Sequence, residues 1–370
     1  MRSSPVRPHA TQKTLRPRSP APVAPPRTGV WAVGAVLVAL VVVRLVAHGP
    51  TALLTLTGVL AMCVLAYVNG ANDVSKGIAT LVGAGVTDYR RAIGWGVLCT
   101  GVGAVLSLLV AQALVATFSA GLLTHGAHFG ATAALAVLVG AIGWVLLATR
   151  TGLPVSTTHA ITGAIVGVGV VSLGTQGVAW GKVVQKIALP LVASPVLALV
   201  LGLSVSVVLR LVPRQVPLAP VHWLSSGATS LARGLNDTPK IVALGAGFVI
   251  TSGATAIPLW VFLAVAASMV GGGWRGGQRV TRTLAEKVTR LDDREGFAAN
   301  VATAFLVTAA SNLGLPVSTT HVSSGAIIGV GLRRGWRAVQ WRTIRDMALA
   351  WLVTIPVAAA VAIAAYLAVR

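Results

Sequence analysis

The stretch NGANDVSKG, residues 69–77, places an aspartate and a lysine inside an apolar segment of the chain. The run ALLTLTGVLAMCVLAYV precedes it and IATLVGAG follows it. Asp73 and Lys76 are three residues apart, so on a helix they share one face and could form an ion pair. A carboxylate in a membrane segment is costly, and such residues usually face a cavity and have a function. The two charges are therefore candidates for a functional site, with a purely structural ion pair as the alternative.

The composition indicates a membrane protein. The 370 residues are 55% hydrophobic and 10% charged, with a mean hydropathy of +0.83. A soluble domain usually has about 25% charged residues. Many apolar runs approach the roughly 20 residues that cross a bilayer, and lipid forces such segments to be helical. The chain is therefore predicted to be an all-α polytopic membrane protein in the lipid bilayer.

The net charge of +21 does not indicate a nucleic-acid partner, because of where the charges lie. The basic residues occur in an N-terminal arm and between apolar runs, which is the positive-inside pattern. Residues 1–28 hold six Lys or Arg and seven prolines, so we expect a disordered basic cytoplasmic arm, with binding to anionic lipid as a second possibility. The apolar run 29–48 is long for a signal peptide and lacks a cleavage site. We expect a multi-pass protein of the cell (plasma) membrane with a cytoplasmic N-terminus.

The chain contains an internal repeat. PVSTTH occurs at residues 154–159 and again at 316–321, an offset of 162. GANDVSK, residues 70–76, corresponds to GLNDTPK, residues 234–240, at an offset of 164. Two copies of one unit are therefore predicted, each with an N-D-x-x-K motif followed by a P-V-S-T-T-H motif.

The loop charges indicate that the two copies are inverted. Residues 118–128 contain no Lys or Arg, whereas the corresponding segment 271–296 contains six. Equivalent loops with opposite charge bias lie on opposite sides of the membrane, as in inverted-topology repeats. The predicted organisation is a basic arm at 1–28, an extra N-terminal transmembrane helix at 29–50, a first repeat at 51–212 and a second repeat at 213–370, with 271–296 as a cytoplasmic loop.

Eleven membrane passes are predicted, one extra helix and five in each repeat. They span 29–48, 51–83, 92–117, 129–149, 152–171, 183–212, 222–246, 250–270, 297–312, 315–331 and 346–369. The segments 152–171 and 315–331 each start with a polar cluster and end rich in glycine. Either could be re-entrant or broken instead of a full span.

The P-V-S-T-T-H motif suits a helix start that binds an oxyanion. Proline is tolerated in the first turn, serine and threonine cap free N–H groups, and the N-terminal dipole favours an anion. Simple capping of ordinary helices is the alternative. The candidate substrate-binding residues are Ser156, Thr157, Thr158, Ser318, Thr319, Thr320, Asn72 and Asn236, and the candidate ion-coupling residues are Asp73, Asp237, Lys76 and Lys240. His159 and His321 could relay protons or only orient the hydroxyls.

These motifs resemble those of the PiT family of inorganic phosphate transporters, also called solute carrier family 20. The resemblance rests on GANDVSKGIATLVG, ARGLNDTPKIVALG, REGFAANVATAFLVTAASNLGLPVSTTH and both PVSTTH stretches, and covers residues 55–365. It implies symport of inorganic phosphate with H⁺ or Na⁺, two inverted repeats and a homodimer. We expect no cofactor and no resident metal, although Na⁺ could bind near Asp73 and Asp237.

One departure concerns the coupling ion. A lysine is typical of only the second copy in the family, whereas this chain has Lys76 as well as Lys240. We hypothesise that the ammonium of Lys76 takes the place of Na⁺ near Asp73, so that protons drive transport; attraction of the anion by Lys76 is the alternative. A sulfate permease of the same fold is the nearest other function. An intramembrane hydrolase using Ser156 and His159, and a channel, are more distant ones, and the duplicated motifs argue against both.

Overall fold

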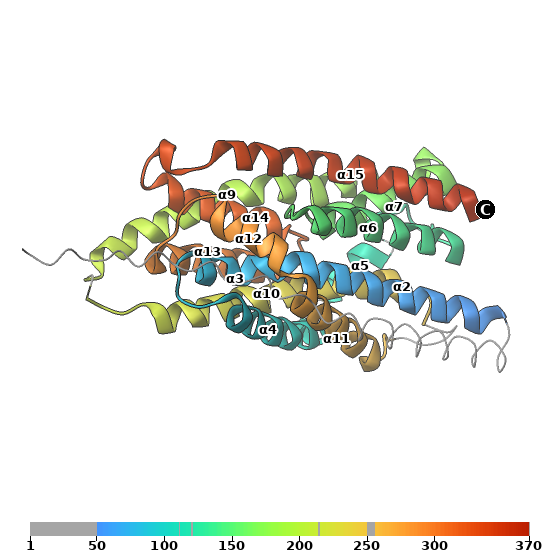
Figure 1. Cartoon of the computed structure of the whole chain (residues 1–370). Helices are drawn as coiled ribbons and strands as arrows, with labels where there is room; N and C mark the ends of the chain where they lie inside the picture. The colour runs from blue at the N-terminus through green and yellow to red at the C-terminus, as the bar shows by residue number, and fades with distance from the viewer. Residues whose placement is uncertain (1–49, 111, 120, 214, 250–255, 370) are drawn as a thin grey trace, which may run out of the picture.

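The computed structural model describes residues 50–369 apart from 111, 120, 214 and 250–255. The predicted arm at 1–28 lies outside the described residues, and so does the predicted extra helix at 29–50, except that Pro50 begins helix α2. The regular structure of the described residues is helical (Figure 1). The predicted all-α class is therefore confirmed.

The helices of the two halves follow one another in a similar order. The first half contains α2 (Pro50–Asp73), α3 (Ser75–Gly83), α4 (Tyr89–Val110), α5 (Gln112–Ser119), α6 (Ala131–Thr151), α7 (Thr157–Leu173), η1 (Thr175–Gly177), α8 (Trp180–Lys182), the π-helix η2 (Val183–Ala188), α9 (Leu189–Val208) and η3 (Leu209–Leu211). The second half contains α10 (Ala219–Ala246), α11 (Leu259–Gly276), α12 (Gln278–Glu286), α13 (Asp293–Asn312), α14 (Thr319–Leu332), η4 (Trp336–Ala338) and α15 (Trp341–Val369).

Six helical stretches of the described chain are long and apolar enough to cross a membrane, fewer than the eleven passes predicted. They are Leu53–Gly83, Tyr89–Leu109, Ala131–Thr151, Trp180–Leu211, Leu259–Gly276 and Trp341–Val369. Helices α7 and α14 have only 17 and 14 residues, below the roughly 20 that span the hydrocarbon core. Helices α10 and α13 are long enough, but their polar and charged residues lower their hydropathy. Length and hydropathy therefore support six of the predicted passes, and the count of eleven stays a prediction, since the pass at 29–48 lies outside the described residues.

Each P-V-S-T-T-H motif forms a break between two helices. The chain leaves α6 at Thr151 and enters α7 at Thr157, and it leaves α13 at Asn312 and enters α14 at Thr319. In each pair the shorter helix packs back against the longer one. The interruptions predicted at 152–171 and 315–331 are therefore present, and two helix N-termini lie inside the protein.

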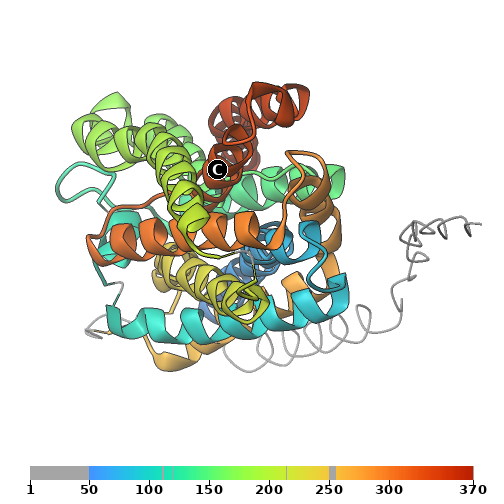
Figure 2. The ribbon, with the colours of Figure 1, turned by 90° about the vertical axis from the view of Figure 1, so that its left-hand side faces the viewer.

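Several helices of each half pack against helices of the other half. Helix α4 packs on α10 of the other half and α11 packs on α2, while α9 packs on α14 and α15 on α7. Seen along the bundle, α2 and α10 lie in the interior, with α15 above and α4 below (Figure 2). The glycine that precedes each N-D pair makes this contact possible. A methyl group at Gly70 would lie 2.1 Å from the Met269 carbonyl oxygen, and one at Gly234 would lie 2.3 Å from the Thr100 oxygen.

The glycines after the P-V-S-T-T-H motifs also serve close packing. A methyl group at Gly163 would lie 2.3 Å from the carbonyl oxygen of Ile355 on α15. A methyl group at Gly325 would lie 2.3 Å from the carbonyl oxygen of Pro195 on α9. Small residues at such positions let helix backbones approach each other closely in a membrane.

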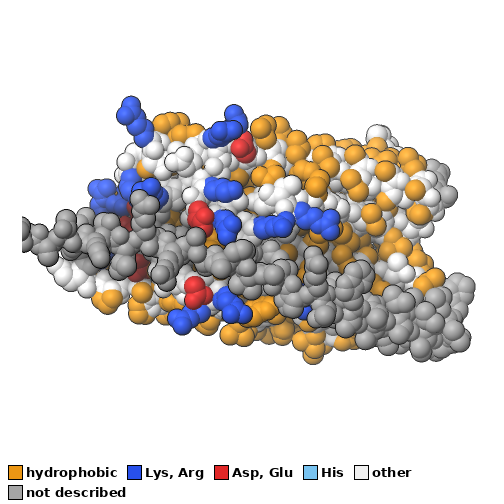
Figure 3. All heavy atoms as spheres, viewed as in Figure 1, with side chains coloured by type: hydrophobic (Ala, Val, Ile, Leu, Met, Phe, Trp, Pro, Cys, Tyr) orange, Lys and Arg blue, Asp and Glu red, His pale blue; other side chains and the backbone are white. Residues whose placement is uncertain are grey.

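Helices α2–α3 and α10 are antiparallel, which is the relation that inverted repeats require. The end of α3 lies beside the start of α10, because Thr80 Oγ1 is 3.1 Å from His222 Nε2. The middle of α2 lies beside the end of α10, where a methyl group at Gly245 would lie 2.2 Å from Met62 Sδ. On the face shown in Figure 3, Lys and Arg gather toward the left, while apolar side chains dominate the right. The side of the membrane on which each end lies stays a prediction.

The segment 271–296, predicted as a cytoplasmic loop, is mainly helical. Helix α11 continues to Gly276, α12 follows at once, and α13 begins at Asp293. Val280 and Leu284 are one helical turn apart and buried, and α12 packs against α3. Because the segment is highly charged, it was predicted to be a loop, although its buried apolar residues have the spacing of an amphipathic helix.

Candidate functional site

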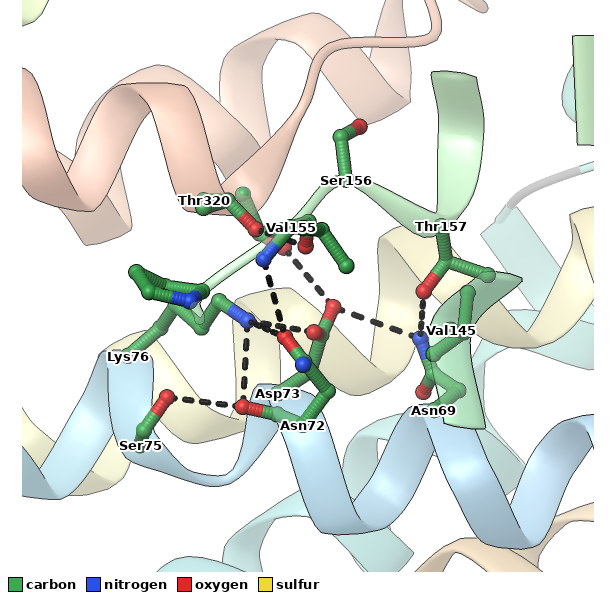
Figure 4. A network of polar contacts seen from close by, with 12 residues as sticks. Asn69, Asn72, Asp73, Ser75, Lys76, Val145, Val155, Ser156, Thr157 and Thr320 are labelled. Carbon is green, nitrogen blue, oxygen red and sulfur yellow. Dashed lines mark hydrogen bonds and ion pairs between the residues drawn. The ribbon is translucent and has the colours of Figure 1, made fainter. Parts of the chain in front are cut away.

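The first N-D-x-x-K motif lies at the junction of α2 and α3, where the helix continues almost without interruption. Val74, between the two, has helical backbone angles and donates its N–H to the Gly70 carbonyl at 3.1 Å. The side chains of Asn72, Asp73 and Lys76 are buried. Lys76 Nζ donates to the backbone oxygen of Asn72 at 3.1 Å and to its side-chain oxygen at 2.9 Å, and it pairs with Asp73 Oδ1 (Figure 4). Buried charges are tolerated when they are paired and hydrogen-bonded in this way. The Asp–Lys pair expected from the spacing is thus present.

The second motif lies on α10, which continues through Pro239. Lys240 Nζ donates to Thr158 Oγ1 at 2.7 Å and to the Val317 carbonyl at 3.1 Å, and it lies 3.5 Å from Asp237 Oδ1. Thr158 belongs to the first P-V-S-T-T-H motif and Val317 to the second. The Lys240 ammonium therefore bridges both copies, whereas the Lys76 ammonium bonds only within its own motif.

Asn69 brings the two aspartates to one place. Its Nδ2 group lies 3.2 Å from Asp73 Oδ2, 3.3 Å from Asp237 Oδ2 and 3.0 Å from Thr157 Oγ1. Thr319 Oγ1, from the second copy, donates to Asp73 Oδ2 at 3.4 Å. The carboxylates of both motifs and a threonine from each copy therefore form a single buried cluster.

The two P-V-S-T-T-H motifs are joined reciprocally. Thr158 Oγ1 donates to the Val317 carbonyl at 3.5 Å, and Thr320 Oγ1 donates to the Val155 carbonyl at 2.6 Å. The first turns of α7 and α14 therefore approach each other in the interior. Helix N-termini present unpaired N–H groups and positive partial charge, which suit an anion.

The asparagines of the motifs fix the helix breaks in position. Asn72 Nδ2 donates to Thr149 Oγ1 and to the Leu153 carbonyl, both at 3.0 Å. In the second copy, Asn236 Nδ2 donates to the Val317 carbonyl at 3.1 Å, and Ser311 Oγ donates to Asn236 Oδ1 at 3.3 Å. Thr149 and Ser311 were not among the predicted site residues, although they occupy matching positions in the repeat.

The two serines cap helices. Ser156 Oγ accepts from the backbone N–H of His159 at 3.2 Å, and Ser318 Oγ accepts from that of His321 at 3.2 Å. Figure 4 shows the Ser156 side chain pointing away from Lys76. The capping interpretation therefore describes the serines, and the threonines are the hydroxyls that face the charges. Ser156 bonds the backbone of His159 and not its ring, unlike a nucleophile and its base.

The two motif histidines lie against each other. The ring centroids of His159 and His321 are 4.6 Å apart, and the ring of Trp351 lies 4.0 Å from that of His321. His321 Nδ1 is 3.3 Å from the carbonyl oxygen of Leu191. The structure thus brings the histidines together, next to the threonines of both copies.

Arg233 is a site residue that the sequence reasoning missed. It lies on α10 with 1% of its surface exposed, and its Nε atom is 3.8 Å from Asp237 Oδ2. Its position corresponds to Asn69 at the repeat offset of 164. An arginine inside the predicted pass 222–246 was the available signal. Among the described residues, no group of three or more His, Cys, Asp or Glu could hold a metal ion.

Buried charges on interrupted, antiparallel helices of a multi-pass membrane protein are the features of a membrane transporter. The sequence profile of the phosphate transporter family matches residues 69–224 and 213–362, and the chain belongs to this family. It is 33% identical over 315 residues to a probable low-affinity inorganic phosphate transporter of Rhizobium meliloti, covering 82% of this chain and 92% of the relative. A protein of the same description from Bacillus subtilis is 31% identical, covering 85% of this chain and 97% of the relative.

A solved structure described as the sodium-dependent phosphate transporter has the same fold. Its TM-score is 0.76 at 25% sequence identity, and the match covers 85% of this chain and 98% of that one. The resemblance of the motifs to a phosphate transporter family is confirmed by these comparisons.

Proposed function

We propose that the chain is a secondary active transporter that imports inorganic phosphate together with protons. The observation that carries the proposal is the convergence of both N-D-x-x-K motifs and both P-V-S-T-T-H motifs on one buried cluster, which Asn69 joins through contacts to Asp73, Asp237 and Thr157. The names of the relatives, probable low-affinity inorganic phosphate transporters, support phosphate as the substrate. Substrate would bind the threonine hydroxyls and the N-termini of α7 and α14.

The polar groups of the cluster favour phosphate over sulfate. Asn69 directs its Nδ2 group to three oxygen atoms, which leaves its Oδ1 atom as a buried acceptor without a partner among the described residues. Phosphate near neutral pH still carries a proton that it can donate to such an acceptor, and sulfate carries none. A site built to pair with a substrate hydroxyl discriminates strongly against an analogue that lacks it.

The lysines support proton coupling. The three oxygen atoms around Lys76 Nζ are a backbone carbonyl, an amide oxygen and a carboxylate oxygen, which are also ligands for a hard cation. Lys240 Nζ likewise lies among a hydroxyl, a carbonyl and a carboxylate. With both ammonium groups in place, a proton on Asp73 or Asp237 is the simplest coupled cation. Coupling to Na⁺ is the second candidate, favoured by the name of the structural relative.

Uptake of labelled phosphate into proteoliposomes tests this assignment. An inward proton gradient at constant Na⁺ should raise the initial rate, and a protonophore should abolish that increase. Replacing external Na⁺ by choline at fixed pH should change the rate little. A steep dependence on Na⁺ at fixed pH would contradict proton coupling, and an absence of phosphate uptake under every gradient would contradict the proposed function.

The arrangement in the cell is also proposed. We infer a protein of the plasma membrane with a cytoplasmic N-terminus, because the basic arm and the basic segments at 90–91 and 333–337 follow the positive-inside pattern. A homodimer is expected from the family resemblance. Cross-linking in intact membranes tests the dimer, and labelling of cysteines introduced next to residues 90 and 333 tests the orientation.

A further inference from the structure

Arg233 is a buried cation whose donors have no hydrogen-bond partner. Its Nε, Nη1 and Nη2 atoms are all buried and donate no hydrogen bond to any atom of the described part of the chain. The contact with Asp237 Oδ2, at 3.8 Å, is an ion pair beyond hydrogen-bond distance. A guanidinium has five N–H donors, and leaving them unpaired away from water is costly. Such a group calls for acceptors that the chain itself does not supply, such as those of a bound anion or of water.

The cluster around Arg233 has one positive charge in excess. Its cations are Lys76, Lys240 and Arg233, and its acids are Asp73 and Asp237, all of them at most 3% exposed. Three positive and two negative groups give a formal charge of +1. One dihydrogen phosphate, or one monohydrogen phosphate with one coupled proton, carries the single negative charge that neutralises this group.

Arg233 also breaks the symmetry of the repeat. The corresponding residue in the first copy, Asn69, donates its amide to both aspartates and to Thr157, so its donors are used within the protein. Arg233 places a guanidinium at the same helix position, and its one ion pair among the described residues is with Asp237. Of the two equivalent positions, the second alone therefore holds a positive group whose N–H donors make no hydrogen bond among the described residues. It approaches Asp237 Oδ2, the atom that Asn69 links to Thr157.

On the basis of the proposed phosphate transport, we propose that Arg233 is the principal anion-binding side chain of the site. Its guanidinium donates two parallel hydrogen bonds to two phosphate oxygens, a geometry that matches arginine and not lysine. Lys76 and Lys240 are engaged by oxygen atoms of the protein and balance the aspartates. The phosphate thus lies between Arg233 and the first turns of α7 and α14.

Thermal unfolding of purified protein in detergent, with increasing phosphate at constant ionic strength, tests this role. A ligand that binds only the folded state raises the melting temperature, so the titration reports affinity without transport. The variants are Arg233→Gln, Arg233→Lys and, as a matched loss of charge, Arg345→Gln, whose side chain is 65% exposed. Arg233→Gln should weaken phosphate affinity about 10- to 100-fold, as expected for lost hydrogen bonds to a charged group.

The phosphate-free melting temperatures separate binding from a structural role. Because Arg233→Gln removes the excess charge and the unpaired donors, its phosphate-free melting temperature should equal or exceed that of the unmodified protein. Arg233→Lys should fold and bind with intermediate affinity, and Arg345→Gln should match the unmodified protein.

Two results would overturn the assignment of Arg233. One is an unchanged phosphate affinity in Arg233→Gln, and the other is an unstable Arg233→Gln together with unchanged affinity in Arg233→Lys. If the unmodified protein neither responds to phosphate nor transports it, the proposed function fails instead. The two failures are therefore distinguishable.

Discussion

Replacing Lys76 by alanine should change the ion dependence of transport. The Lys76 ammonium is fully buried and bonded to two oxygen atoms of Asn72 and one of Asp73. Removing one partner of a buried ion pair costs about 3–5 kcal/mol, because the other charge is left uncompensated. In Lys76→Ala the three oxygen atoms face the volume that the ammonium occupied, and Na⁺ can recover part of this loss.

We therefore expect Lys76→Ala to unfold several degrees below the unmodified protein without Na⁺ and to be stabilised by Na⁺. Phosphate uptake by this variant into proteoliposomes at fixed pH should rise with external Na⁺. Lys240→Ala is the matched control, because it removes the same charge but leaves Asp237 with Arg233 at 3.8 Å. Lys240→Ala should therefore gain less Na⁺ dependence. An unchanged ion dependence in Lys76→Ala, with only weaker phosphate affinity, would refute the reasoning and support direct anion attraction by Lys76.

Three further outcomes follow from the packing and from the site. Gly70→Ala should lower the free energy of unfolding by about 1–3 kcal/mol, because the new methyl would lie 2.1 Å from a backbone oxygen of α11 and overpack the contact. Less of this variant should therefore reach the membrane. Gly181→Ala is the control and should be neutral, because no atom lies within 4 Å of the added methyl. Thr158→Val should reduce uptake more than Thr320→Val, because it also removes the acceptor 2.7 Å from Lys240 Nζ; equal rates would contradict the bridging role of that lysine. A tenfold excess of sulfate should compete weakly with labelled phosphate, and strong competition would favour the sulfate alternative.

The sequence predicted which buried residues come together where a polar motif was duplicated. Asp73 and Asp237 stood out because carboxylates are rare in apolar segments, and their repetition beside two P-V-S-T-T-H motifs indicated one shared site. The capping preference of serine predicted a helix start at each P-V-S-T-T-H motif. The prolines expected in the first turn, Pro154 and Pro316, lie before the caps, because the helices begin at Thr157 and Thr319. Local rules thus specified these elements.

Features set by tertiary packing could not be predicted in this way. The contact of Lys240 with Thr158 joins residues 82 positions apart in sequence, and no local pattern encodes it. Arg233 was overlooked because the equivalent position of the first repeat holds Asn69, which is uncharged. The comparison of the two repeats therefore showed no duplicated charge at this position. Hydropathy also could not decide whether 152–171 and 315–331 cross the membrane, since it does not show that the helices within them begin only at Thr157 and Thr319.

The central claim is that both copies of the N-D-x-x-K motif serve one phosphate transport site. Uptake of labelled phosphate in a transport-deficient host, normalised to the amount of protein in the membrane, tests it most directly. Asp73→Asn and Asp237→Asn should each abolish uptake while reaching the membrane normally, and Asp346→Asn, at an acid whose side chain is 49% exposed, should transport like the unmodified protein. Near-normal uptake in either Asp73→Asn or Asp237→Asn would contradict the shared site.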